Sequence, residues 1–214
     1  MHLAEGVLSV PVLATTSALA VGGLVVGLRR LTEAQLPLAA LLGAAFFVAS
    51  TIHVPVGVGS VHLVLNGLAG LLLGWSVFPV FFVALLLQAA LFSFGGFTVL
   101  GANLLIMAVP ALLAHVLLRP LVSAGEEGLP ASRGRLIAAG AGCGLIGVGG
   151  AALLASAALA ASGGSLFMRL VQLFVVAHLP VFVVDSVISA LTLSLLARMA
   201  PQALAPAPAP AANG

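Results

Sequence analysis

The chain has 214 residues, of which 62% are hydrophobic and only 6% are charged, and its mean hydropathy is +1.31. A typical soluble domain is about 25% charged. The few charged side chains of this chain cannot give it a water-compatible surface. The composition therefore predicts an integral membrane protein. A net charge of +2 is too small for a nucleic-acid-binding surface. The lack of Lys in the sequence excludes the P-loop of an ATPase.

Apolar stretches close to the length that spans a membrane, about 20 residues, recur along the chain. Backbone groups find no water in hydrocarbon, so these stretches predict helices and an all-α membrane fold. The stretch 60–93 is ambiguous, because it fits one long helix or two short ones, 60–75 and 77–93, with a break near Gly74. The remaining predicted spans are 7–28, 36–52, 99–118, 136–161 and 168–197.

The arginines indicate how many times the chain crosses the membrane, since cytoplasmic loops carry an excess of basic residues. Seven spans with the N-terminus outside leave only Arg169 outside, whereas six spans would put three or four of the seven arginines inside. We therefore predict seven transmembrane helices, with the N-terminus outside and the C-terminus cytoplasmic. The arginines on the cytoplasmic side are then Arg29, Arg30, Arg119, Arg133, Arg135 and Arg198.

The ends of the chain differ in character. We expect one multi-pass domain over residues 1–200, embedded in the lipid of the inner (cytoplasmic) membrane, and a disordered Ala/Pro-rich tail over 201–214. The N-terminal apolar run is preceded by Glu5 rather than by basic residues, which argues against a cleaved signal peptide.

Three of the five histidines meet on the outer side in this topology: His2, His53 and His62. A free α-amine, the next amide nitrogen and the imidazole of residue 2 can chelate one metal ion in fused rings. That set favours Ni(II) or Cu(II), which accept planar nitrogen ligands, and also admits Co(II). One coordination position on the metal is left for another imidazole, which could come from His62 or else from His53. The alternative is that these histidines bind nothing, and the sequence leaves both interpretations open.

Several runs resemble the CbiM/NikM family, the substrate-binding components of energy-coupling factor transporters for cobalt and nickel. Residues 1–6 (MHLAEG) are similar to its N-terminal motif Met-His-Ile-Pro-Asp-Gly. Residues 59–75 (GSVHLVLNGLAGLLLGW) and 91–103 (LFSFGGFTVLGAN) resemble two of its loops with the helices that follow. The segment 178–180 (HLP) fits its last helix.

The resemblance implies that the amine of Met1, the amide and imidazole of His2, and the imidazole of His62 bind the metal. It implies two kinds of partner, a transmembrane coupling (T) component and cytoplasmic ATPase subunits, and no organic cofactor. The chain departs from the family pattern in the surroundings of the site, where Ile106 stands in place of a second Asn and Asp185 in place of a Glu.

Three polar residues within the predicted spans are candidates for supporting roles. Asn103 could orient the outer loops or a ligand histidine. Asp185 is the one acidic residue deep in a span, and His178 lies two turns earlier on the same helix face. The pair could form a polar track or proton relay below the metal loop, or Asp185 could be a structural residue that fixes helix packing.

Small residues at every fourth position form a stripe at Ala14, Ala18 and Gly22. Such stripes allow helices to approach closely, and internal packing is the simpler interpretation. The family resemblance adds a contact with the coupling subunit as the alternative.

Three functions compete at this point. The leading hypothesis is capture of Ni(II) or Co(II) for ATP-driven uptake by partner subunits, so that the chain itself is not an enzyme. The alternative is a self-sufficient ion- or proton-coupled carrier that uses His178 and Asp185. A membrane enzyme is disfavoured, because Ser60 and His62 are spaced i, i+2 and no carboxylate accompanies them.

Overall fold

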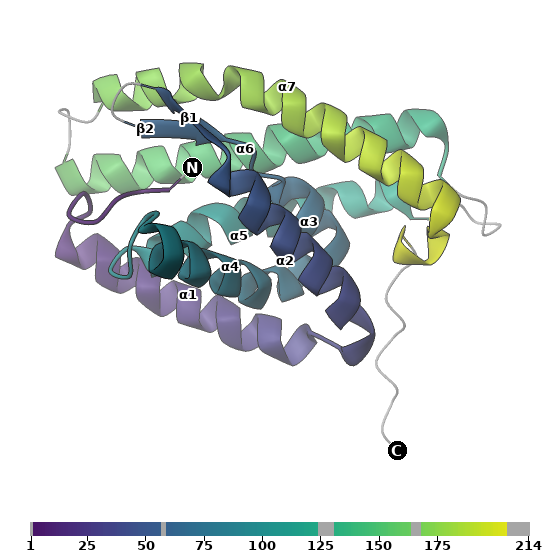
Figure 1. The fold of residues 1–214 in the computed structure, drawn as a ribbon, viewed down its shortest axis with the longest axis horizontal. Helices are drawn as coiled ribbons and strands as arrows, with labels where there is room; N and C mark the ends of the chain where they lie inside the picture. Colours follow the sequence, from purple (N-terminus) through teal and green to yellow (C-terminus); the bar gives the residue numbers. More distant parts are fainter. Residues whose placement is uncertain (1, 57–58, 124–130, 164–167, 205–214) are drawn as a thin grey trace.

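The computed structural model describes residues 2–56, 59–123, 131–163 and 168–204, with the side chains of 53–61, 168–171 and 173–175 outside the description. Within these residues the fold is a bundle of seven α-helices with one short β-hairpin (Figure 1). The helices are α1 (Val10–Arg30), α2 (Leu36–Thr51), α3 (Asn66–Leu73), α4 (Val77–Phe92), α5 (Leu100–Val122), α6 (Arg133–Gly163) and α7 (Met168–Met199). The smaller elements are the strands β1 (His53–Val56) and β2 (Gly59–His62) and the 3-10 turns η1 (Glu33–Gln35), η2 (Gly74–Ser76) and η4 (Pro201–Leu204).

The all-α prediction is confirmed, and each predicted span corresponds to a helix. The two-helix interpretation of 60–93 is the correct one, since η2 separates α3 from α4. The hairpin occupies the segment that was expected to be an outer loop. Residues 205–214 of the predicted tail lie outside the described residues, and its first four residues form η4. The domain boundaries therefore stay a prediction.

Contacts between helices show that the chain reverses direction at η2. In α3, Asn66 bonds to the carbonyl of Met107, and one turn later the backbone of Gly70 approaches that of Ala111. Because the contacts advance in the same direction along both helices, α3 runs parallel to α5. Along α4, Gln88 bonds to the carbonyl of Phe47, while Val80 lies against Gly43. Helix α4 therefore runs parallel to α2. It starts after Gly74, which lies against His115 in the second half of α5, and ends at the short loop before α5, so it runs antiparallel to α5.

The number of membrane crossings is not settled by helix length. Six stretches of the described residues are long and apolar enough to span a membrane, and one of them, Asn66–Phe92, contains both α3 and α4. With 8 residues, α3 alone is about 12 Å long, less than half of the hydrocarbon core of about 30 Å. The seven-span count and the orientation of the termini thus remain predictions.

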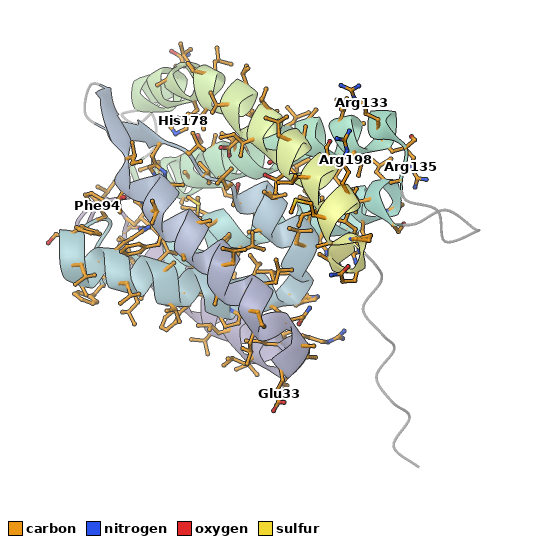
Figure 2. The ribbon with its side chains drawn as sticks, turned by 45° about the vertical axis from the view of Figure 1, so that its right-hand side comes forward. Glu33, Phe94, Arg133, Arg135, His178 and Arg198 are labelled. Atoms are coloured by element: carbon orange, nitrogen blue, oxygen red, sulfur yellow. The ribbon has the colours of Figure 1, made fainter. Side chains whose placement is uncertain are left out.

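Most of the arginines lie near the ends of helices. Arg29 and Arg30 end α1, and Arg119 lies in the last turn of α5. Figure 2 shows Arg133, Arg135 and Arg198 at one end of the bundle, away from Phe94 and His178. Arg135 donates a hydrogen bond to the carbonyl of Pro120, which fastens the start of α6 to the end of α5.

The exterior of the bundle carries many large apolar side chains. Leu19, Leu41, Leu153 and Val183 are 60–70% exposed, whereas Phe46, Phe81 and Met107 are completely buried in the core. Soluble proteins avoid large exposed apolar surfaces, so the outer face is suited to lipid. The chain is a multi-pass membrane protein.

Because α3 and α5 are in close contact at Gly70, we expect a methyl group added at this residue to destabilise the fold strongly. A Cβ at Gly70 would overlap the backbone of Ala111. Because backbone cannot give way as a flexible side chain does, Gly70→Ala should destabilise the bundle by about 1–3 kcal/mol, seen as a lower melting temperature in detergent. Gly22→Ala is the matched control, since nothing lies within 4 Å of its added Cβ. Equal melting temperatures for the two variants would contradict this packing.

Candidate metal site

The N-terminal segment is fixed into one end of the bundle by its own main chain. The N–H of Leu3 donates to Oδ1 of Asn103 at 2.9 Å, and Nδ2 of Asn103 donates to the carbonyl of Leu3 at 3.1 Å. The side chain of Leu3 is buried. Glu5 accepts hydrogen bonds from the N–H and the hydroxyl of Thr98 at 3.0 and 3.2 Å. These contacts hold the backbone of His2 in a defined place.

The loop between α4 and α5 closes over this segment, and its shape depends on glycine. Gly95 has φ +77°, which residues with a side chain rarely adopt. A Cβ at Gly95 would also lie 2.7 Å from Nδ2 of Asn103 and 3.8 Å from Cβ of His2. The loop therefore packs directly on the bonded pair of Leu3 and Asn103.

Two imidazoles meet beneath this loop. The rings of His2 and His62 are stacked, with centroids 5.1 Å apart and planes inclined by 25°. Nε2 of each ring is buried and has no hydrogen-bond partner. Since buried polar atoms normally have partners, these two unsatisfied nitrogens are candidate metal ligands.

The second nitrogen of His62 is oriented by the main chain. Its Nδ1–H donates to the carbonyl of Leu63 at 2.8 Å. This bond fixes the tautomer that keeps the lone pair on Nε2 and turns that nitrogen toward a ligand. The pairing is the usual arrangement for a histidine that coordinates a metal.

Burial of the two rings favours the neutral form of imidazole, which is the form that binds metals. Burial lowers the pKa of His2 to about 4, opposed by a weaker polar contact with the Gln88 side chain. Burial likewise lowers the pKa of His62, opposed by its bond to Leu63. Burial therefore reduces the competition between protons and a metal ion for these nitrogens.

A small cavity of about 140 Å³ lies at the two rings. Behind it, the side chain of Gln88 donates to the hydroxyl of Ser50 and to the carbonyl of Phe47. Both Gln88 and Ser50 are fully buried. The cavity lining consists of His2, Ala4, Ser50, His62, Ser93, Phe94 and Gly95.

The described residues hold no group of three or more His, Cys, Asp and Glu side chains close enough to bind one metal. Two imidazoles alone make an incomplete site. The missing donors would be main-chain nitrogens, the amide of His2 and the amine of Met1. Met1 lies outside the described residues, so its place in the site remains a prediction.

The other predicted residues are placed as follows. His53 pairs through its backbone with His62 in the hairpin, and its side chain is outside the description. Asp185 is buried on α7 and accepts hydrogen bonds from the N–H groups of Val64 and Leu65. His178 is buried on the same helix, near the end that lies beside the hairpin (Figure 2). Because both carboxylate oxygens of Asp185 already accept main-chain hydrogen bonds, these contacts do not favour a proton relay.

Three buried polar residues near the site were not predicted from the sequence as candidates: Ser50, Asn66 and Gln88. Asn66 donates to the carbonyls of Met107 and Gly147 at 3.1 Å, so it ties α3 to α5 and α6. A signal did exist, because polar side chains are rare in apolar spans and usually face the bundle interior.

The small residues of α1 form two different faces. Gly23 and Gly27 pack against Phe78 and the start of α4. Ala14, Ala18 and Gly22 are exposed on the outside of the bundle. Internal packing, the simpler interpretation of that stripe, is therefore wrong within this chain.

The fold is that of a multi-pass membrane protein, and two stacked imidazoles with unpartnered Nε2 atoms lie at one end of it. Residues 2–203 match the family described as CbiM, "Cobalt uptake substrate-specific transmembrane region", and the chain belongs to this family. It is a cobalt/nickel uptake membrane component of the CbiM type, and the family is a transport component rather than an enzyme.

Relatives and solved structures agree. A "Putative metal transport protein" of Haemophilus influenzae is 55% identical over 95% of this chain and 97% of its own length. The "Fused nickel transport protein NikMN" of Rhodobacter capsulatus is 34% identical over 99% of this chain, which covers 66% of that protein. A crystal structure of a truncated transition metal transporter matches with a TM-score of 0.75 at 24% identity, over 92% of this chain and 98% of that one. The likeness to that structure supports the fold.

Proposed function

We propose that this chain captures Ni(II) or Co(II) on the outer side of the membrane with four nitrogen donors. These are the amine of Met1, the amide and imidazole of His2, and Nε2 of His62. The observation that carries the proposal is the stacked pair of imidazoles whose buried Nε2 atoms have no hydrogen-bond partner. The proposal requires a free amine at Met1.

The geometry suits a chelate built on the main chain. Asn103 bonds to both polar groups of the Leu3 backbone, so the adjoining His2 amide is held in place before a metal arrives. Preorganisation of this kind reduces the entropy that binding must overcome. The His2 amide must lose a proton to coordinate, and Ni(II) and Cu(II) favour that planar nitrogen field.

Transport would need partners to supply energy. The chain has no Lys for a P-loop, and we propose that a coupling (T) component and cytoplasmic ATPase subunits complete the transporter. The exposed stripe of Ala14, Ala18 and Gly22 offers close helix–helix contact, and we assign it to the coupling component.

Uptake of radioactive nickel into proteoliposomes tests this division of labour. We expect ATP-dependent uptake when the chain is reconstituted with the coupling component and ATPases, and none from the chain alone. Proton-driven uptake by the chain alone would instead support a self-sufficient carrier using His178 and Asp185. That alternative is disfavoured because both oxygens of Asp185 already accept main-chain hydrogen bonds.

A further inference from the structure

We propose that Asp185 is the counter-charge and positioning residue of the metal site, acting on His62 through the peptide group between Leu63 and Val64. This inference deepens the proposed function and rests on it. The carboxylate would orient the ligand imidazole and offset the positive charge that the bound metal brings into the protein.

The carboxylate of Asp185 is fully engaged by main chain from the segment that follows His62. Leu65 N–H donates to Oδ2 at 2.9 Å, and Val64 N–H donates to Oδ1 at 3.4 Å. Asp185 is only 2% exposed. Because both oxygens act as acceptors, the geometry fits the ionised carboxylate, which has no proton to donate.

One peptide group connects this carboxylate to the ligand. The N–H of Val64 and the C=O of Leu63 belong to the same peptide unit. Its N–H points to Asp185, and its oxygen accepts the Nδ1–H of His62 at 2.8 Å. Hydrogen bonds in a chain polarise one another, so the negative charge of Asp185 makes Nε2 a better electron donor. Histidine ligands are commonly oriented by a carboxylate directly, and here a peptide group stands between the two.

The backbone conformation shows that this segment is held in place by contacts. Leu65 has φ +53°, in the left-handed region, which is unfavourable for a residue with a side chain. The bond from its N–H to Asp185 stabilises that conformation. Helix α3 begins at the next residue, so the same bonds set the start of α3 and the position of His62.

The charge balance also favours Asp185. A divalent metal bound to one deprotonated amide keeps a charge of +1, and burial of a net charge is costly in a medium of low dielectric constant. Glu5, the acidic residue nearest to His2 in the sequence, is exposed and bonded to Thr98. Asp185 is buried and joined to the site through His62, so the loaded site would be neutral overall.

Asp185→Asn tests the proposal, because the amide keeps the size of the side chain but loses the charge and one acceptor. We expect Ni(II) affinity to fall about 10- to 100-fold, the range typical of residues that orient metal ligands. Since loading releases the His2 amide proton, the pH of half-loading at fixed nickel should rise by about one unit for each tenfold loss. Asp185→Glu keeps the charge and should recover affinity to within about tenfold.

Controls separate positioning from a structural role. Ser189→Ala removes another buried polar side chain one turn further along α7 and should bind nickel as the unaltered protein does. A purely structural Asp185 would lower the melting temperature of Asp185→Asn without moving its pH of half-loading. A folded Asp185→Asn protein with unchanged affinity and pH of half-loading would overturn the proposal.

A measurement on the unaltered protein keeps the proposal testable should Asp185→Asn fail to fold. Nickel should slow hydrogen exchange at the amides of Val64 and Leu65, because metal on Nε2 strengthens the bonds behind it. Unchanged exchange there, in protein that has bound nickel, would overturn it. Protein that binds no nickel would instead contradict the proposed function, so the two failures are distinguishable.

Discussion

A His2→Ala variant should lose stoichiometric binding of Ni(II) and Co(II). The substitution removes one of the two stacked imidazoles at the site, and with it the ring that closes the N-terminal chelate. We expect affinity to fall by more than about 100-fold, beyond the 10- to 100-fold typical of residues that only orient a ligand. Titration of the purified protein in detergent, with bound metal counted per chain, measures the loss.

The fold should survive this change. The bonds that dock the N-terminal segment come from the main chain of Leu3 and from Glu5, not from the His2 side chain. His115→Ala is a suitable control, because His115 bonds to Leu71 through Nδ1, far along α5 from the site. One metal per chain at unchanged affinity in His2→Ala would remove His2 from the site.

The two hairpin histidines should respond differently to the same substitution. His62→Gln removes the second buried Nε2, and we expect nickel affinity to fall by more than about 100-fold here as well. His53→Gln changes the residue that pairs with His62 across the hairpin and should leave affinity within a fewfold of normal. Glutamine preserves hydrogen-bonding capacity, so both variants should keep the hairpin.

The visible spectrum adds a second readout to this pair. Loss of one nitrogen donor from a planar field should shift the absorption of bound nickel in His62→Gln and leave it unchanged in His53→Gln. The reverse pattern would assign the fourth donor to His53. Equal, small effects from both variants would show that neither histidine of the hairpin is a ligand.

Much of the fold could be predicted because lipid imposes simple rules on sequence. Apolar runs of membrane-spanning length marked the long helices, and the break at 74–76 was visible from glycine and proline near it. Arginines marked the end at which α1, α5 and α7 finish. Each apolar run and each break is a local feature of the sequence, and the arginines can be counted along the chain. A single sequence is therefore enough to predict these features.

The site was only partly predictable. His2 and His62 could be brought together from topology and from the family resemblance, and the structure shows them in contact. The bonds from Asn103 to Leu3 and from Asp185 to Val64 and Leu65 could not be predicted, because they join side chains to main-chain groups that every residue possesses. The outward-facing Ala14 stripe was uncertain for a related reason: small residues pack equally well inside a chain or against a partner.

The most direct test of the N-terminal chelate is a metal titration of the unaltered protein beside a version with one extra residue before Met1. Ni(II), Co(II) and Cu(II) are added in turn, and visible absorption and bound metal per chain are recorded. We predict one metal per chain with the spectrum of a planar nitrogen site, lost when the extra residue displaces the amine. Binding that survives the extension would contradict the chelate and move the site to side chains alone.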